Sequence, residues 1–310
     1  MSALICGSLA FDSIMVFEDQ FKNHILADKV HMLNVCFMVP EMRKAYGGCA
    51  GNIAYNLKLL GGDPYPMAAV GTDFEPYRAR LDQLGISRRY VLELDDCFTA
   101  QAFITTDLDD NQITAFHPGA MMYSHRNQVR DAQGISIGIV APDGRDAMFQ
   151  HSEQFAESSI PFFFDPGQGL PLFDGDNLKM FIEQATWVTV NDYESELIKE
   201  RTGYSEKDIA WRVDAYIVTR GGEGSTIYTR DEALEIAVAN AASLEDPTGC
   251  GDAYRAGLIY GLENKLDWRT TGRIASLMGA IKMEHKGTQD HSFSMDDFRQ
   301  RFQQEFGYVF

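Results

Sequence analysis

Residues 187–202 read Trp-Val-Thr-Val-Asn-Asp-Tyr-Glu-Ser-Glu-Leu-Ile-Lys-Glu-Arg-Thr, a short β-rich run followed at once by a segment of helical character. Similar β-rich runs recur at 135–140, 160–164 and 216–219. Segments of helical character follow them as well, for example at about 147–158 and 175–185. Strands that alternate with helices at this spacing indicate βαβ units. The chain therefore predicts a parallel sheet with helices on both faces.

The rest of the chain predicts further elements of both kinds. Strands are expected at 4–6, 13–17, 30–39, 66–70, 89–94, 100–106 and 112–116. Helices are expected at 50–60, 75–84, 252–262, 268–285 and 296–306. The sequence contains no low-complexity segment, internal repeat or linker-like stretch. It predicts one large α/β domain with a small β-rich outgrowth formed by residues 13–40 and 95–116.

Charge and composition narrow the range of partners. Asp and Glu number 45 against 27 Lys and Arg, which gives a net charge of −18. The electrostatic field of this negative charge repels nucleic acid and anionic membranes, so we expect neither as a partner. No uncharged apolar stretch reaches the roughly 18 residues that a membrane-spanning helix needs, and the start of the chain lacks the basic region of a signal peptide. Five dispersed cysteines without a C-x-x-C pair favour a reducing cytoplasm over a disulfide framework or a zinc site.

The most informative segment for chemistry is Asp246-Pro247-Thr248-Gly249-Cys250-Gly251-Asp252-Ala253-Tyr254. Two glycines flank a small residue just before a predicted helix, where free backbone N–H groups and the helix dipole attract an anion. Glycine allows close approach of a phosphate, and Asp252 beside it is suited to accept a proton from an attacking hydroxyl. The same pattern also fits a simple helix cap, and spacing alone does not decide between the two interpretations.

Three other segments place polar groups at the ends of predicted elements. Gly47, Gly48 and Asn52 precede and begin a helix, where they suit either a polar ligand or a plain turn. Asn191 and Glu194 follow a strand and suit either the waters of a Mg²⁺ ion or a capping box. The last of these three segments, at 219–224, suits either a nucleotide-facing turn or a hairpin turn into 226–229.

Taken in this order, the segments resemble the ribokinase-like (PfkB) carbohydrate kinase family over essentially the whole chain. The family pattern Asp-Thr-x-Gly-Ala-Gly-Asp is similar to residues 246–252 and departs from it at Pro247 and Cys250. Its Gly-Gly-x-x-x-Asn, Asn-x-x-Glu and Thr-x-Gly-x-x-Gly patterns are similar to residues 47–52, 191–194 and 219–224. Within the family the chain most resembles the adenosine-kinase-like nucleoside kinases, since Asn23 to Ala27 is similar to their Asp-Gln-Ile-Leu-Ala.

The resemblance implies a ribokinase-like fold in which residues 1–310 form a single unit. In this fold a large domain built on a parallel sheet carries a small β-sheet lid, formed by about residues 13–40 and 95–120. It implies transfer of the γ-phosphoryl of ATP to the 5′-hydroxyl of a nucleoside such as adenosine or inosine, in purine salvage. Asp252 is then the general base, in a catalytic group completed by Gly249, Cys250 and Gly251. The implied substrate-binding residues are Asp12, His24, Gly47, Gly48, Asn52, Gln112 and Phe116. The implied ATP-binding residues are Asn191, Thr219, Gly221, Gly224, Thr248 and Ser276.

The resemblance also implies Mg²⁺, held by Glu194 and Asn191 largely through water, and it makes Asp246 a candidate site for a monovalent cation such as K⁺. His24 and Gln112 replace a Gln and an Arg of the nucleoside kinases, and the latter change removes a positive charge from the place where the phosphate is expected. The expected partner is a small-molecule nucleoside, and the expected assembly is a monomer or a homodimer.

Three alternatives remain open. A dehydrogenase is disfavoured because Gly7-Ser8-Leu9-Ala10-Phe11 lacks the G-x-G-x-x-G that seats a pyrophosphate. A non-catalytic sensor is disfavoured because it needs no general base at position 252. The remaining alternative is a sugar or sugar-phosphate kinase of the same family, whose lid requires a cation for which only Lys29 is a candidate.

Overall fold

The computed structural model describes residues 2–25, 31–32, 34–109 and 111–310. The strands of its larger sheet are β1 (Ser2–Cys6), β4 (Asp63–Val70), β5 (Tyr90–Glu93), β8 (Ile135–Val140), β9 (Phe162–Phe164), β10 (Trp187–Asn191), β11 (Ala215–Thr219), β12 (Ser225–Tyr228) and β13 (Ala233–Ile236). Their order is β13-β12-β11-β10-β9-β8-β1-β4-β5. All neighbours from β11 to β5 are parallel, whereas β12 and β13 are antiparallel at one edge. The predicted parallel sheet is therefore confirmed.

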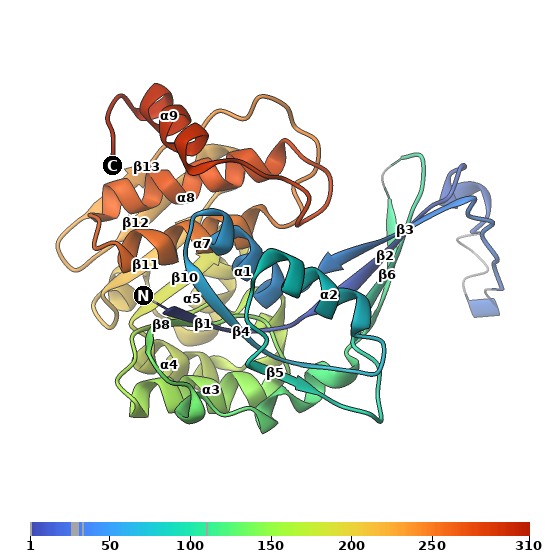
Figure 1. Cartoon of the computed structure of the whole chain (residues 1–310), viewed down its shortest axis with the longest axis horizontal. Helices are drawn as coiled ribbons and strands as arrows, with labels where there is room; N and C mark the ends of the chain where they lie inside the picture. The colour runs from blue at the N-terminus through green and yellow to red at the C-terminus, as the bar shows by residue number, and fades with distance from the viewer. Residues whose placement is uncertain (1, 26–30, 33, 110) are drawn as a thin grey trace.

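Helices cover both faces of this sheet (Figure 1). The α-helices are α1 (Cys49–Leu59), α2 (Glu75–Leu84), α3 (Arg145–Glu157), α4 (Gly175–Gln184), α5 (Asp192–Thr202), α6 (Glu206–Ala210), α7 (Cys250–Glu263), α8 (Trp268–Met283) and α9 (Met295–Phe306). Short 3₁₀ helices occupy Phe21–Asn23, Gly119–Arg126, Val129–Asp131, Gly167–Leu172 and Gly221–Glu223. Side chains alternate along β1, so that Ala3 and Ile5 join the core shared with α1 and α7, and Leu4 and Cys6 join the core under α3 and α4.

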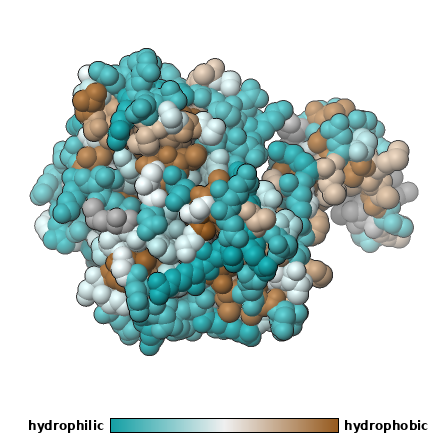
Figure 2. All heavy atoms as spheres, in the orientation of Figure 1, coloured by the Kyte–Doolittle hydropathy of each residue, from teal (hydrophilic) through white to brown (hydrophobic). Residues whose placement is uncertain are grey.

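The smaller sheet projects from the side of the molecule (Figure 1). Its strands are β2 (Ala10–Val16), β3 (Glu41–Gly47), β6 (Ala100–Thr106) and β7 (Gln112–His117), in the order β3-β2-β6-β7. Figure 2 shows brown, apolar side chains on this projection, where Met42, Ile113 and Phe116 are exposed. Because β2 begins four residues after the end of β1, the smaller sheet is connected directly to an interior strand of the larger one, the third from the β5 edge.

The strand expected at 30–39 is wrong. Val30 and Leu33 lie outside the described residues, and 34–39 form no regular structure. The third strand of the smaller sheet is instead β3, whose residues Glu41 to Lys44 are exposed and so show no apolar alternation. The apolar residues that suggested a strand have a different use, since Phe37 packs against Phe17 and Phe21.

In the described part of the chain, no helix combines the length and the apolar character needed to cross a membrane.

Candidate active site

Helix α7 begins within the glycine-rich segment of residues 246–254. Gly249 adopts a left-handed conformation with φ of 83°, which reverses the chain and starts the helix at Cys250. The Cys250 N–H donates to the carbonyl of Pro247 at 3.2 Å, so it is already engaged in the turn. Burial raises the pKa of the Cys250 thiol to about 11, so that this thiol is protonated at neutral pH. The backbone amides that remain for an anion at this helix start therefore include those of Gly249 and Gly251.

Asp252 lies in the first turn of α7 and is joined by hydrogen bonds to a chain of buried amides. Its Oδ2 accepts from Asn52 Nδ2 at 2.9 Å, and Asn52 Oδ1 accepts from Gln289 Nε2 at 3.0 Å. Gln289 Nε2 also donates to the hydroxyl of Tyr77, which in turn donates to the carbonyl of Gly47. Because every donor in this series has an assigned acceptor, these hydrogen bonds fix the orientation of Asn52 and with it the position of the Asp252 carboxylate.

The electrostatics of Asp252 suit a proton acceptor. The side chain is half-buried, and loss of hydration raises its pKa to about 6, although the Arg255 cation and the Asn52 bond act in the opposite direction. The negative charges of Asp165 and Asp12 add to the increase. A carboxylate with this pKa is ionised at neutral pH and is a stronger base than an exposed aspartate.

Asp12 faces the same region from the smaller sheet. It lies on β2 opposite Ala45 of β3, and a Cβ atom placed on Gly47 would lie 2.5 Å from its Oδ2. Gly47 therefore leaves room for the Asp12 carboxylate. Gly48, with φ of 83°, lets the chain pass close to Ser8 and Ala10, where a Cβ atom would lie 2.5 Å from the Ser8 carbonyl. Burial raises the pKa of Asp12, and the Arg43 cation partly offsets this shift.

A buried ion pair that the sequence pattern does not single out lies next to Asp252. Arg255, one turn further along α7, donates to both carboxylate oxygens of Asp165, with 2.7 Å between Nη2 and Oδ1. A Cβ atom on Gly251 would lie 2.6 Å from Arg255 Nη1, so the guanidinium is directly beside the helix start. The sequence gives one indication that Arg255 lies beside Asp252. The two residues are three positions apart on a helix, and residues at that spacing share one helix face.

Four of the six expected ATP-binding residues follow the carboxyl ends of β10 and β11, whereas Thr248 lies in the loop before α7, where its amide donates to Asp246 Oδ1 at 2.9 Å. Asn191 and Thr219 are paired neighbours in register, and Gly221 and Gly224 follow in the turn to β12, which forms the hairpin that was one of the two interpretations. Ser276 is instead buried in α8, where its hydroxyl donates to the Ala237 carbonyl and accepts from the Ala239 amide. Those two bonds give Ser276 a structural use.

Glu194 and Asn191 form the capping box that was the alternative interpretation of their spacing. The Asn191 side chain accepts from the Glu194 amide, and Glu194 Oε2 accepts from the Asn191 amide, both at 2.8 Å. Burial and the charge of Asp165 raise the pKa of Glu194, and the Arg255 cation acts in the opposite direction. Within the described residues, no three His, Cys, Asp or Glu side chains lie close enough together to hold a metal ion on their own.

The remaining expected substrate residues occupy different parts of the smaller sheet. Phe116 lies opposite Ala102, which lies opposite Asp12, so these three residues share one face. Gln112 is four residues further along β7, about 14 Å away at the rise of an extended strand, and it is exposed. His24 lies beyond the end of β2, where its Nε2 bonds to Asp19 Oδ2 at 2.8 Å and its ring packs on Phe17. The structure therefore brings Phe116 towards Asp12, whereas Gln112 is exposed further along the strand and His24 has local partners.

The expectation that Lys29 is the only cation near the lid is wrong, because β3 supplies two more. Lys29 itself lies outside the described residues. Arg43 is opposite Ile14 and so shares the face of Asp12, and its Nη1 is 3.8 Å from the position of a Cβ on Gly287. Lys44 points to the other face, where its Nζ lies 3.7 Å from the centre of the Phe11 ring. Arg43 thus provides a positive charge between the smaller sheet and the loop that begins at Gly287.

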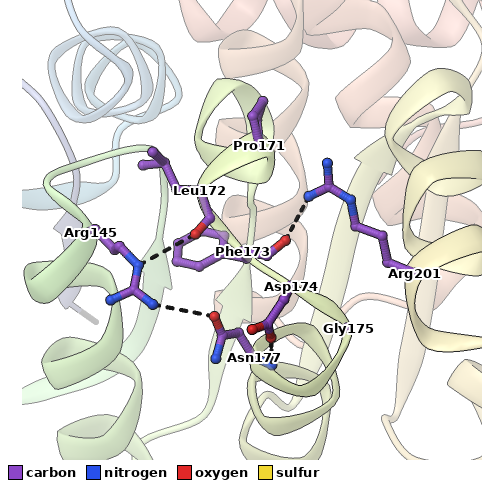
Figure 3. A pocket seen from close by; sticks show the side chains of 8 residues that line it. All are labelled: Arg145, Pro171, Leu172, Phe173, Asp174, Gly175, Asn177 and Arg201. Carbon is purple, nitrogen blue, oxygen red and sulfur yellow. Dashed lines mark hydrogen bonds between the residues drawn. The ribbon is translucent and has the colours of Figure 1, made fainter.

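A separate cavity, shown in Figure 3, lies between the start of α3 and the end of α5. Its two arginines are directed at backbone carbonyls, since Arg201 donates to Leu170 and Phe173 and Arg145 to Leu172. None of the expected site residues lines this cavity, so we place the candidate active site at the start of α7.

Comparisons with known proteins show which proteins the chain is similar to. The model of the pfkB family of carbohydrate kinases matches residues 24–294. A nucleoside kinase of Methanocaldococcus jannaschii is 33% identical over 275 residues, which cover 87% of this chain and 89% of that protein. The structure of Burkholderia thailandensis nucleoside kinase in complex with inosine is 54% identical, covers 99% of both chains and has a TM-score of 0.91. The same enzyme in complex with ADP-inosine has a TM-score of 0.88 at 55% identity over 99% of this chain and 97% of that chain.

Proposed function

Because the chain belongs to the pfkB family of carbohydrate kinases, we propose that it transfers the γ-phosphoryl group of ATP to the 5′-hydroxyl of a nucleoside. The observation that carries this proposal is the juxtaposition at the start of α7 of a carboxylate with a pKa of about 6 and a glycine-rich anion site. Similarity to nucleoside kinases at 33% and 54% identity supports the nucleoside over a sugar as the acceptor. The inosine and ADP-inosine complexes of the Burkholderia enzyme point to a purine nucleoside and to ATP as the donor.

In the proposed reaction the Asp252 carboxylate accepts the proton of the 5′-hydroxyl. The 5′-oxygen then forms a bond to the γ-phosphorus while the bond from that phosphorus to the β–γ bridging oxygen breaks, and ADP leaves. The amides of Gly249 and Gly251 and the Arg255 cation are placed to stabilise the charge on the transferred group. Phosphoryl transfer depends mainly on such positioning and charge stabilisation.

The residues at the end of β10 fit a Mg²⁺ ion that is held mainly by phosphates and water. Mg²⁺ is usually bound through one or two carboxylates plus substrate phosphates rather than by an all-protein cage. Glu194, with Asn191 beside it, offers one carboxylate close to the Arg255–Asp165 pair. When bound, the ion would neutralise part of the charge on the ATP phosphates, which a chain of net charge −18 otherwise repels.

The smaller sheet acts in this proposal as a lid that holds the nucleoside. Its inner face carries Asp12 for the ribose hydroxyls and Phe116 for the flat base, with Ala45 and Ala102 leaving space between strands. Arg43, from the same face, adds a positive charge near the Gly287 loop. Gln112 carries no charge where the nucleoside kinases have an Arg, and in this proposal Arg43 of β3 supplies a positive charge instead.

A coupled assay of ADP release tests the function. We expect ADP to form with ATP and inosine or adenosine, and much more slowly with ribose, fructose or their phosphates. ADP release with a free sugar but with no nucleoside would establish the sugar kinase alternative. No ADP with any acceptor would contradict a kinase activity altogether.

Asp12 is expected to anchor the substrate. Replacing Asp12 with Asn should weaken nucleoside binding, because hydrogen bonds to a charged acceptor contribute about 1.5–3 kcal/mol each, which corresponds to roughly a 10- to 150-fold rise in Kd. Calorimetric titration of nucleoside measures this directly. The variant should keep a normal KM for ATP, and an unchanged nucleoside Kd would remove Asp12 from the substrate site.

A further inference from the structure

A buried lysine lies behind the loop that presents the anion site. Lys282 is in the last turn of α8 and its side chain is 0% exposed. Its Nζ donates to the backbone carbonyl of Asp246 at 2.7 Å and to that of His285 at 2.9 Å. Lysine is rarely buried unless its charge is compensated, so this placement requires an explanation.

The Asp246 segment is also where the family resemblance led us to expect a monovalent cation. Backbone carbonyl oxygens are suitable ligands for K⁺ because they replace its hydration shell. Here, however, the Asp246 carbonyl is bound to the Lys282 ammonium. The Asp246 carboxylate is also engaged, since Oδ1 accepts from the Thr248 amide and Oδ2 from the Gly287 amide, both at 2.9 Å. The residues present therefore do not fit a K⁺ ion at Asp246.

We propose that the Lys282 ammonium is a built-in replacement for a dissociable monovalent cation. It holds a fixed positive charge against the Asp246 carbonyl, four residues before Cys250, and so maintains the loop from which Gly249 and Gly251 offer their amides. This inference rests on the proposed kinase function, and it makes Lys282 a positioning residue, because its Nζ contacts the loop and not the substrate. It follows that the enzyme turns over fully without K⁺.

A purely structural interpretation is the main alternative. Lys282 lies at the carboxyl end of α8, where a cation stabilises a helix through its dipole. That role predicts lower thermal stability when the charge is lost, but it does not predict that an added cation restores the rate. The experiments must therefore measure kcat and Tm separately, and they must vary the cation that is added.

The first experiment uses the unmodified protein with ATP, inosine and MgCl₂ at constant ionic strength in K⁺, Na⁺ or tetramethylammonium chloride. We expect kcat to be equal in all three within the error of the assay. Several-fold stimulation by K⁺ would overturn the inference. A complete lack of nucleoside-dependent ADP release would instead contradict the proposed function, so the two failures are distinguishable.

The second experiment compares Lys282→Ala, which leaves space for an ion, with Lys282→Met, which fills that space without a charge. In tetramethylammonium chloride both should lose about 10- to 100-fold in kcat, as is typical when support behind a charged site is removed, with the nucleoside KM nearly unchanged. K⁺ or NH₄⁺ should restore much of the rate of Lys282→Ala but not that of Lys282→Met. Lys207→Ala, an exposed lysine on α6, is the matched control and should behave as the unmodified protein.

Normal kcat in both Lys282 variants would overturn the inference. A lowered Tm with no rescue of Lys282→Ala would do so as well, leaving Lys282 a structural residue. If neither variant folds, the cation series on the unmodified protein still decides the question.

Discussion

Asp252→Asn is expected to lower kcat by about 10²- to 10⁴-fold, the usual contribution of a positioned general base. Asn keeps the size of the side chain and an oxygen that accepts from Asn52, but it has no basic oxygen for the proton of the hydroxyl. Nucleoside affinity should change little, because Asp12 and the smaller sheet hold the substrate. Single-turnover rates beside nucleoside Kd values measure the two effects separately, and a near-normal rate would show that Asp252 is not the base.

The pH dependence provides a second check on the same residue. Since burial raises the pKa of Asp252 to about 6, protonation should reduce kcat/KM of the unmodified enzyme as the pH falls through that value. The pH profile of the residual activity of Asp252→Asn should not show this decrease at acidic pH. The raised pKa also means that the ionised carboxylate destabilises the fold above pH 6. Asp252→Asn should therefore have an equal or higher Tm at pH 8, which excludes unfolding as the cause of its low rate.

Gly251→Val is expected to suppress turnover by about 10²- to 10³-fold, the effect of losing a preorganised anion donor. Its Cβ would lie 2.6 Å from Arg255 Nη1, and Arg255 has little freedom to move because it is bound through two atoms to Asp165. The branched side chain would also occupy the approach of the phosphoryl group to the amides of α7. Nucleoside Kd should stay close to normal, since the proposed nucleoside contacts, Asp12 and Phe116, belong to the smaller sheet.

Gly251→Ala serves as the graded comparison, with a smaller loss than Gly251→Val because only one carbon is added. Measured kcat values for the series establish whether the loss follows side-chain size. If Gly251→Val turned over at the normal rate, the Gly251 amide would have no part in phosphoryl transfer.

Most of the fold could be predicted from the sequence because its strands and helices carry strong local patterns. The helices expected at 75–84 and 192–202 coincide with α2 and α5, and the strand expected at 135–140 coincides with β8. The strand β3 could not be predicted, because an exposed strand beside β2 has no need for apolar alternation. The apolar pattern at 30–39 was misleading, since it reflects packing of Phe37 in an irregular segment.

The candidate site was only partly predictable, for a different reason. Glycine-rich motifs revealed Gly249 and Asp252 because close approach of backbone to a ligand leaves a recognisable pattern. Gln289 and Arg43 have no such pattern, and they become meaningful only when the tertiary fold brings them to Asn52 and Gly287. Ser276 has structural hydrogen bonds that the sequence pattern does not reveal, because its hydroxyl connects α8 to the backbone after β13.

The contact between Asn52 and Asp252 joins residues 200 positions apart, and that from Gln289 to Asn52 spans 237. Forming such contacts requires closure of very long loops, whose entropic cost must be met before the contacts contribute any stability. The base and the amides that orient it thus come together only when the C-terminal third docks on α1. During synthesis the N-terminal strands and helices can form early, but a chain still emerging from the ribosome has no assembled site. Assembly of the candidate site therefore requires the chain to be complete at least to Gln289.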